Sequence, residues 1–165
     1  MTGLRGLPEN MEMHLVDNIE EAFALKRWLG ERRPINLLGL DTESSGLNPY
    51  ADDAELRMVQ IGDKVTGWAI PWQRWGGVAM EVLNDWEGDF AAHNLAFDAK
   101  WLNIHAKWDI PWHKMHDTMI MYNMLYPGDP AGLKHVTDKH IDPRASVGQQ
   151  LLDNSFKKNG WTWAN

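Results

Sequence analysis

The sequence predicts an α/β domain with a mixed sheet of about five strands flanked by helices. Two observations support this prediction. Strand-like stretches, either alternating or uniformly apolar, gather in the first half of the chain. Stretches with helical spacing and capping residues gather in the second half. A chain of 165 residues that is 44% hydrophobic can bury a core, so we expect a single domain over residues 1–165.

The first elements are an edge strand and a helix. Residues 11–16 alternate apolar and polar side chains, which is typical of a strand with one exposed face. Asp17, with Glu20 three residues later, has the pattern of a capping box, so a helix is expected to begin there. Apolar residues recur at helical spacing up to residue 29. Gly30 is a residue that favours the end of a helix.

Three strands are expected next. Residues 35–41 form a short apolar run, which predicts a buried strand. Residues 44–53 are rich in Ser, Gly, Asn, Pro and Asp and indicate a loop. Residues 55–62 and 65–70 have the composition of two strands joined by a turn at residues 63–64.

The middle of the chain leads to a second helix. Residues 71–77 are predicted to be a tryptophan-bearing loop and residues 78–83 a short helix. Residues 90–93 indicate a short strand. Asn94 is a favoured N-cap residue, so we expect it to cap a helix that runs to about residue 104.

The C-terminal part is predicted to be helical. Asp117 is placed to cap a helix that carries several apolar residues, and residues 133–141 have helical spacing. Ser146 and Gln149 form a capping box for a final helix, which Gly160 is expected to end.

Composition limits the function. The chain has no cysteine, which excludes disulfides and thiolate metal sites. No apolar run approaches the ~20 residues of a membrane span, and the N-terminus lacks the apolar core of a signal peptide, so no membrane contact and a cytoplasmic location are expected. Residues 1–130 hold 20 acidic and 11 basic side chains, whereas residues 131–165 hold 3 and 5. Such a chain is a poor non-specific duplex binder but suits a short strand end held at carboxylates.

Three carboxylates point to metal chemistry. Asp41 and Glu43 follow an apolar strand at spacing i, i+2, so they face the same way. Asp98 lies at the start of a predicted helix, four residues after Asn94. In the alternative interpretation, Asp41 and Glu43 are solvated carboxylates at a strand end, and Asp98 is an acid that the helix dipole favours in the first turn of a helix. Together, however, the three suit two Mg²⁺ or Mn²⁺ ions that hydrolyse a phosphodiester.

Several motifs resemble the DEDD 3′–5′ exonucleases, and most closely the proofreading domain of phage-like family A DNA polymerases. The first motif is Asp41-Thr42-Glu43, followed by Met58-Val59-Gln60-Ile61-Gly62. The second is His93-Asn94-Leu95-Ala96-Phe97-Asp98. Asp117-Thr118-Met119 and Gly132-Leu133-Lys134-His135-Val136 resemble the helices that follow. The resemblance covers residues 38–141.

The resemblance implies a ribonuclease H-like fold and removal of nucleotides from a single-stranded DNA 3′ end. Asp41 would bridge both metals, Glu43 would bind the first metal and orient the water, and Asp98 would hold the second, mostly through water. Further residues fall where the family contacts its substrate, namely Thr42, Leu47, Asn94 and Phe97. Leu47 matches an apolar wedge against the terminal base. The alternative for Leu47 is a loop residue tucked into the core, and for Phe97 a core residue.

The third motif of the family, Tyr or His followed four residues later by Asp, is the main departure. His113-Lys114-Met115-His116-Asp117 matches literally but comes too early, so we interpret it as structural, with Asp117 as an N-cap. Three later acids lack a Tyr or His four residues before them: Asp138, Asp142 and Asp153. The C-terminal part is therefore expected to be truncated before its last catalytic helix, and residues 1–165 to be weakly active or inactive.

Three functional interpretations stay open. The first is a proofreading exonuclease, the N-terminal part of a DNA polymerase acting in a host cytoplasm. The second is a stand-alone exonuclease on RNA, similar to ribonuclease D, which the stretch Leu56-Arg57-Met58-Val59-Gln60-Ile61 also resembles. The third is a non-catalytic module that grips a single-stranded 3′ end or docks a partner through some of its ten tryptophans. Activity on matched DNA and RNA strands separates the first two.

Overall fold

The computed structural model describes residues 11–34, 36–141 and 147–160. They form two compact units. The sheet unit is Glu12–Thr118, and the helical unit holds Met11 and the described residues from Met119 onward. Within these ranges, no helix combines the length and apolar character that crossing a bilayer requires.

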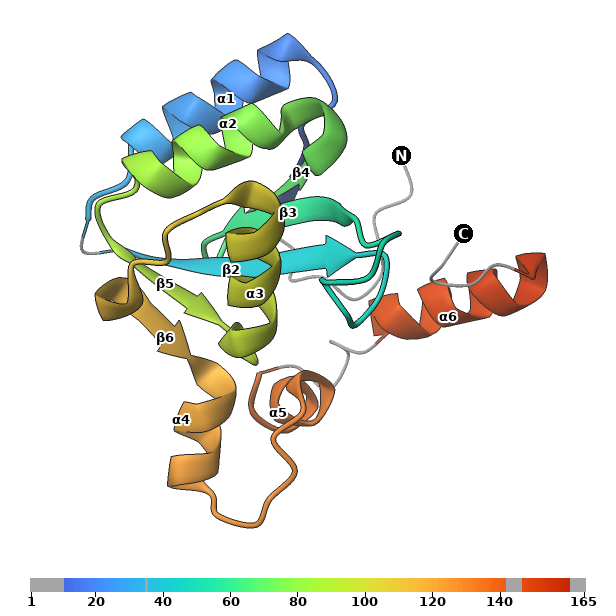
Figure 1. Cartoon of the computed structure of the whole chain (residues 1–165). Helices are drawn as coiled ribbons and strands as arrows, with labels where there is room; N and C mark the ends of the chain where they lie inside the picture. Colours follow the sequence, from blue (N-terminus) through green and yellow to red (C-terminus); the bar gives the residue numbers. More distant parts are fainter. Residues whose placement is uncertain (1–10, 35, 142–146, 161–165) are drawn as a thin grey trace. The chain divides into compact units, whose positions relative to one another are not determined.

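The sheet unit is built on one mixed sheet with the strand order β1-β4-β3-β2-β5-β6 (Figure 1). Two strand pairs, β2 with β3 and β3 with β4, are antiparallel, and the other three are parallel. The mixed sheet is thus confirmed, with six strands rather than about five. The strands are β1 (Glu12–Leu15), β2 (Leu37–Ser44), β3 (Leu56–Gly62), β4 (Thr66–Pro71), β5 (Asp89–Ala92) and β6 (Met115–Asp117).

Three helices share one core with this sheet. They are α1 (Ile19–Gly30), α2 (Trp72–Asp85) and α3 (Leu95–Ala106), and a 3₁₀ turn η1 (Trp112–Lys114) precedes β6. Helices α1 and α2 run side by side (Figure 1). Their apolar faces join the buried strand residues in a single cluster, in which Trp101, Phe90 and Leu25 are among the largest fully buried side chains. Burial of such side chains is the main stabilising contribution to the unit.

Helix α1 begins one residue later than the sequence indicates. Its N-cap is Asn18, whose side chain accepts a hydrogen bond from the backbone N–H of Glu21. The prediction that Asp17 caps the helix with Glu20 was therefore wrong by one position, because Asn18 is an equally good cap with an acid three residues on. The helix ends at Gly30 as predicted.

Helix α2 replaces the loop predicted for residues 71–77. It begins at Trp72, directly after Pro71, and two helical segments join across a kink at Trp75. A side chain at Gly76 would lie 3.1 Å from the ring of Trp72, so this glycine lets the first turn close. The glycines and the proline of this segment suggest a loop, but the segment forms a kinked helix that packs on β3 and β4.

Strand β2 differs from the predicted uniformly buried strand. It starts at Leu37 and continues to Ser44, and residue 35 lies outside the described residues. Only alternate side chains, those of Leu38, Leu40 and Thr42, are buried. Helix α3 packs on the strand, and the side chains that alternate with the buried ones are exposed.

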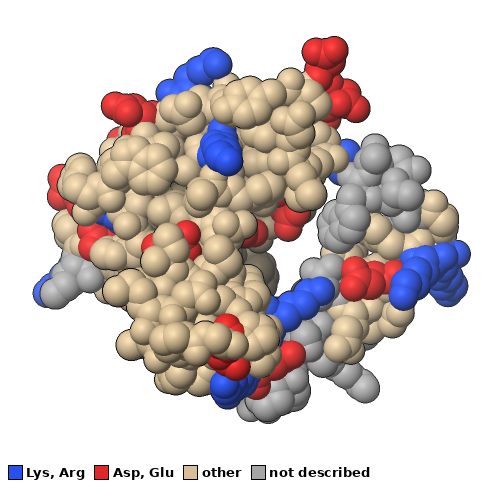
Figure 2. Space-filling model, turned by 60° about the horizontal axis from the view of Figure 1, so that its bottom comes forward, with Lys and Arg blue, Asp and Glu red and all other residues tan. Residues whose placement is uncertain are grey.

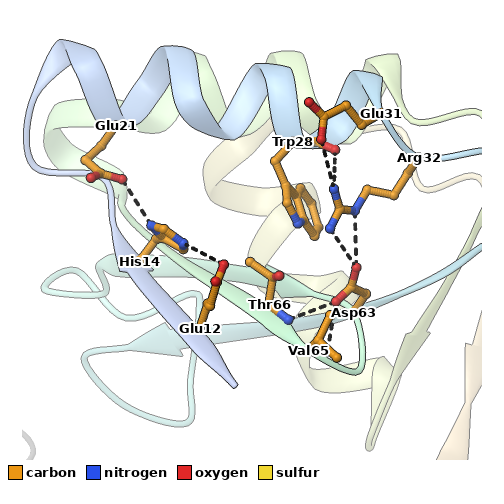
Figure 3. Close-up of polar contacts among 9 residues, drawn as sticks. All are labelled: Glu12, His14, Glu21, Trp28, Glu31, Arg32, Asp63, Val65 and Thr66. Carbon is orange, nitrogen blue, oxygen red and sulfur yellow. Dashed lines mark hydrogen bonds and ion pairs between the residues drawn. The ribbon is translucent and has the colours of Figure 1, made fainter. Parts of the chain in front are cut away.

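A polar network joins the β3–β4 turn to the end of α1 (Figure 3). The guanidinium of Arg32 donates to Asp63 Oδ2 from Nε and Nη2, at 3.1 and 3.0 Å, and lies over the ring of Trp28. Asp63 Oδ1 accepts from the backbone N–H groups of Val65 and Thr66. These bonds lower the pKa of Asp63 against the effect of its burial, and they fix the register of the hairpin that carries β3.

The helical unit contains α4 (Thr118–Leu125) apart from its first residue, together with α5 (Leu133–His140) and α6 (Val147–Asn159). The helix predicted for residues 133–141 is confirmed. Asp129 Oδ2 accepts from the hydroxyl of Tyr122 and from Lys139 Nζ, so it ties α4 to α5. The predicted cap Ser146 lies outside the described residues, and Gly160 follows α6 with a φ of 66°.

Candidate active site

Strand β2 brings two of the predicted carboxylates together. Asp41 and Glu43 lie on the exposed face of the strand, and Thr42 between them is buried. In the register of the sheet, Asp41 stands opposite Gln60 of β3. The amide Nε2 of Gln60 lies 3.5 Å from Glu43 Oε1. Gln60 was not predicted as a site residue, although it lies in the stretch of residues 58–62 that carries part of the resemblance.

Both carboxylates of β2 are held in surroundings that disfavour their charge. Although Asp41 is exposed, withdrawal from water raises its pKa, against a backbone hydrogen bond from Thr42. Withdrawal from water and then the charge of Asp41 raise the pKa of Glu43, whereas the bond from Gln60 lowers it. Among the described residues, neither group takes part in an ion pair. A nearby cation would therefore stabilise both ionised groups.

Asp98 is the most buried acid of the site, with 2% of its surface exposed. It lies in the first turn of α3, and its Oδ1 accepts two hydrogen bonds from Thr42. The backbone N of Thr42 is 2.9 Å away and its Oγ1 is 2.7 Å away. Burial raises the pKa of Asp98 to about 7; the bonds from Thr42 oppose this, and the charge of Asp41 adds to it. The second motif is thus fastened to the middle residue of the first.

The start of α3 is capped from another strand. Asn94 is the N-cap, as predicted, but it has a left-handed φ of 65° and its side chain makes no capping bond. The carboxylate of Asp117, at the end of β6, accepts from the backbone N atoms of Asn94 and Leu95 at 3.2 and 3.0 Å. Sequence spacing missed this role because the two segments are 22 residues apart and β6 was not predicted.

The proposed substrate contacts differ in exposure. Leu47 is 88% exposed, so the alternative that it is tucked into the core was wrong. Asn94 is exposed and Thr42 is buried. Phe97 is half-buried and packs against the core, with its ring centroid 6.2 Å from that of Trp101. Leu47 and Asn94 are therefore accessible to a ligand, whereas Thr42 acts through its bonds to Asp98.

The early match to the third motif is engaged in other contacts. His113 lies in η1, His116 Nε2 is 2.8 Å from Asp89 Oδ2, and Asp117 caps α3. His105 and Asp109 have the same spacing, although they were not predicted as a match. The ring of His105 stacks on Trp101 and lies 3.0 Å from the carbonyl oxygen of Pro49. Asp117 and His105 are thus engaged in contacts that shape the fold.

The donor set fits hard divalent cations. Within the described residues, no three His, Cys, Asp or Glu side chains converge on one point. Asp41 and Glu43 share the exposed face of β2. Asp98, on helix α3, is turned toward Thr42 of β2. All donors are carboxylate oxygens whose charges are uncompensated, which is the chemistry that Mg²⁺ and Mn²⁺ select.

Known proteins resemble this chain in sequence. The model of a family described as 3′–5′ exonuclease matches residues 16–163. The chain is 27% identical over 120 residues to a DNA polymerase of Mycobacterium phage L5, which covers 70% of this chain. It is 29% identical over 101 residues to a DNA polymerase of Mycobacterium phage D29, which covers 56% of this chain. The chain spans only 20% and 16% of the lengths of these relatives.

Solved structures share the fold at low identity. The catalytic core of RRP6 from Trypanosoma brucei matches 79% of this chain and 34% of its own, with a TM-score of 0.62 and 18% identity. Escherichia coli RNase D, an exoribonuclease, matches 79% and 34%, with a TM-score of 0.56 and 18% identity. Brucella melitensis NrnC with bound Mg²⁺ matches 93% and 85%, with a TM-score of 0.57 and 18% identity.

Proposed function

Because the chain belongs to the 3′–5′ exonuclease family whose model matches residues 16–163, we propose that it removes nucleotides from a DNA 3′ end by two-metal phosphodiester hydrolysis. The resemblance to polymerase proofreading domains is confirmed by this match and by the phage polymerases. The ribonuclease H-like fold is confirmed as well. The choice of DNA rests on the phage relatives, which are DNA polymerases.

The observation that carries the mechanism is the pair of bonds from Thr42 to Asp98. They hold the acid of α3 against the residue that lies between the two acids of β2, near enough to Asp41 for its charge to raise the pKa of Asp98. We assign Asp41, Glu43 and Asp98 as the groups that would hold two Mg²⁺ or Mn²⁺ ions. When bound, such ions lower the pKa of an attacking water and stabilise the leaving oxygen.

The remaining residues position the strand and the water. Glu43 would accept a hydrogen bond from the attacking water and so orient it, and the amide of Gln60 would orient Glu43 in turn. The exposed Leu47 would wedge against the terminal base, and Asn94 and Phe97 would contact the strand at the start of α3. Thr42 keeps Asp98 in place. Asp98 in turn must be ionised to act as a ligand, so its raised pKa makes metal binding sensitive to pH.

The charge pattern agrees with contacts to a short strand end. The chain has a formal net charge of −7, and on the face shown in Figure 2 the Lys and Arg side chains stand in separate groups. Tight duplex binding requires many phosphate contacts, which such a surface does not offer. We propose that a polymerase domain in a longer chain supplies most DNA affinity, and that the protein acts in the cytoplasm of a phage host.

The first test is calorimetric titration of Mn²⁺ into the purified chain, alongside Asp41→Ala and Asp98→Ala. We expect both substitutions to weaken binding at least tenfold, because each removes a direct or water-mediated ligand. An Asp89→Ala variant, which removes an exposed acid that pairs with His116, is the matched control. Binding that is equally weakened by the control, or by none of the variants, would contradict the assignment.

An RNA exonuclease is the second candidate, because RNase D shares the fold. A DNA strand and an RNA strand of the same sequence separate the two functions. Faster shortening of the RNA by a version of the protein that carries the complete family motif set would favour the second candidate.

A further inference from the structure

Helix α3, which carries Asp98, also borders a groove of 410 Å³ within the sheet unit. Its floor is formed by α3 and includes Ala96, Ala99, Lys100 and Asn103. Tyr50 lines one part of it and Trp112 another. None of these side chains belongs to the carboxylate site, so the groove is a separate feature of the surface.

The aromatic ring of Tyr50 is exposed on an anchored backbone. The side chain is 74% exposed. Its backbone N donates to Asn48 Oδ1 at 3.1 Å, and the carbonyl oxygen of the preceding Pro49 lies 3.0 Å from His105 Nε2 on α3. The loop is therefore fastened to the helix that forms the groove floor, while the ring stays available.

Trp112 is presented in the same way. It is 63% exposed, and its backbone N donates to the carbonyl oxygen of Ile110 at 2.9 Å. The segment before it is tied to α3, because Asn103 Nδ2 donates to the carbonyl oxygen of Trp108 at 3.1 Å. Two large exposed rings held by fixed backbones lose little conformational freedom when a flat ligand stacks on them.

The chemistry of the groove favours nucleobases. The alanines of the floor leave room beside the helix, and the exposed rings offer stacking surfaces. Lys100 offers one cation for a phosphate, and Asp109 on the groove edge offsets it. Stacking rather than charge must therefore provide the affinity, which distinguishes this groove from a basic channel.

The loop after β2 and helix α3 each carry residues of both the groove and the proposed site. The loop that follows Glu43 carries first Leu47 and then Tyr50. Helix α3 carries Asp98 and the groove floor, and the floor from Ala96 to Asn103 is roughly 10 Å long, room for two or three stacked nucleotides. We propose that this groove holds unpaired nucleotides of the DNA strand whose 3′ end enters the carboxylate site, with bases on Tyr50 and Trp112. The proposal rests on the proposed function for the direction of the strand.

A ring of single-stranded DNA tests the groove apart from the carboxylate site, because a ring has no 3′ end. The probe is a fluorescein-labelled circle of about 30 thymidines, with EDTA present, and the readout is fluorescence anisotropy. Trp112→Ala and Tyr50→Ala should each weaken binding roughly tenfold, as expected for the loss of one stacking surface. Raising the salt concentration should weaken binding only slightly, about as expected for a single phosphate contact.

Two matched controls complete the design. Phe23→Ala removes an equally exposed aromatic side chain from α1, and Lys64→Ala removes an exposed lysine from the β3–β4 turn. Both should bind the circle like the unchanged protein, whereas Lys100→Ala should bind it two- to fivefold more weakly. Circular dichroism confirms that each variant is folded.

The outcomes separate the groove from the exonuclease site. If the circle does not bind, or if the Trp112 and Phe23 variants bind it equally well, the proposal that the groove holds single-stranded DNA is wrong. Circle binding that depends on Trp112 supports it even if Asp41→Ala leaves metal binding unchanged, a result that would overturn the proposed function alone. A circle of uridines that binds tenfold more tightly than the thymidine circle would overturn the assignment to DNA.

Discussion

Thr42 binds Asp98 twice, through its backbone N–H at 2.9 Å and its hydroxyl at 2.7 Å. This contact joins residues that are 56 positions apart and connects the central strand of the sheet with the first turn of α3. It also makes the residue between the two β2 carboxylates responsible for the geometry of the third.

The hydroxyl of Thr42 is therefore expected to matter for metal binding. Thr42→Val keeps the shape and the backbone bond but removes the Oγ1 donor, so the pKa of Asp98 should rise further. Hydrogen bonds to charged groups contribute about 1.5–3 kcal/mol, so Mn²⁺ affinity should fall roughly tenfold or more in calorimetry. Thr42→Ser retains the hydroxyl and should stay close to the unchanged protein. Equal affinities for the Val and Ser variants would show that the bond is dispensable.

The pH dependence of stability follows from Asp98. Its pKa is about 7 in the folded chain and 3.8 in the unfolded reference, so the folded chain holds the proton more tightly. The metal-free chain should lose free energy of unfolding as the pH rises from about 4 through 7, by at most about 4 kcal/mol. Asp41 and Glu43, whose pKa values are also raised, act in the same direction.

Thermal unfolding in EDTA between pH 5 and 8 measures this effect. The melting temperature should fall toward pH 8, and Asp98→Asn should show a flatter profile because it cannot ionise. With Mn²⁺ the trend should reverse, since the ion competes with the proton and binds better above pH 7. Parallel profiles for the two chains in EDTA would mean that Asp98 is not the titrating group.

Asp117 is expected to act on stability and not on metal binding. It accepts from two backbone N–H groups at the start of α3. Loss of a capping side chain costs about 1–2 kcal/mol, so Asp117→Ala should lower the free energy of unfolding by that amount in urea. Mn²⁺ affinity per folded molecule should change less than threefold. Loss of metal binding in a folded Asp117→Asn variant would instead identify the early His113–Asp117 match as a catalytic motif.

Two glycines give a matched test of backbone packing. A Cβ at Gly88 would lie 2.4 Å from the carbonyl oxygen of Pro34 and 2.6 Å from the Trp86 ring, so Gly88→Ala should destabilise the chain by about 1–3 kcal/mol. A Cβ at Gly77, inside α2, meets nothing within 4 Å. Gly77→Ala should therefore stabilise the chain by about 0.5–1 kcal/mol. Urea unfolding of both variants is the measurement, and a shift of the same sign in both would refute the packing account.

The sequence predicted elements with long local patterns better than short or glycine-interrupted ones. The strands over residues 55–62 and 65–70 and the helix over 133–141 were found because their patterns are long and local. Strand β6 has three residues and no pattern of its own, and only its pairing with β5 defines it. Helix α2 was missed at its start because Gly76 and Gly77 are loop signals, whereas packing on β3 and β4 favours the helix.

The candidate site shows the same division. The shared face of Asp41 and Glu43 follows from the two-residue period of a strand and was predictable. The contacts of Thr42 with Asp98, and of Asp117 with α3, depend on tertiary distance and were not. Local spacing identifies which residues can act, whereas the partners that orient them emerge only from the packing of distant segments.

The activity of residues 1–165 themselves is the last expectation. The family's third motif would add a metal-ligating Asp and a Tyr or His beside the water, and the literal matches in this chain serve other contacts. With fewer ligands for the first ion, hydrolysis should be at least 100-fold slower than in a longer protein that carries the motif. Release of nucleotides from a 3′-labelled single strand with Mn²⁺ measures the rate, with Asp41→Ala as the blank. A fast rate that disappears in the Asp41 variant would mean that the described carboxylates are sufficient, and would require a water-positioning group from within this chain.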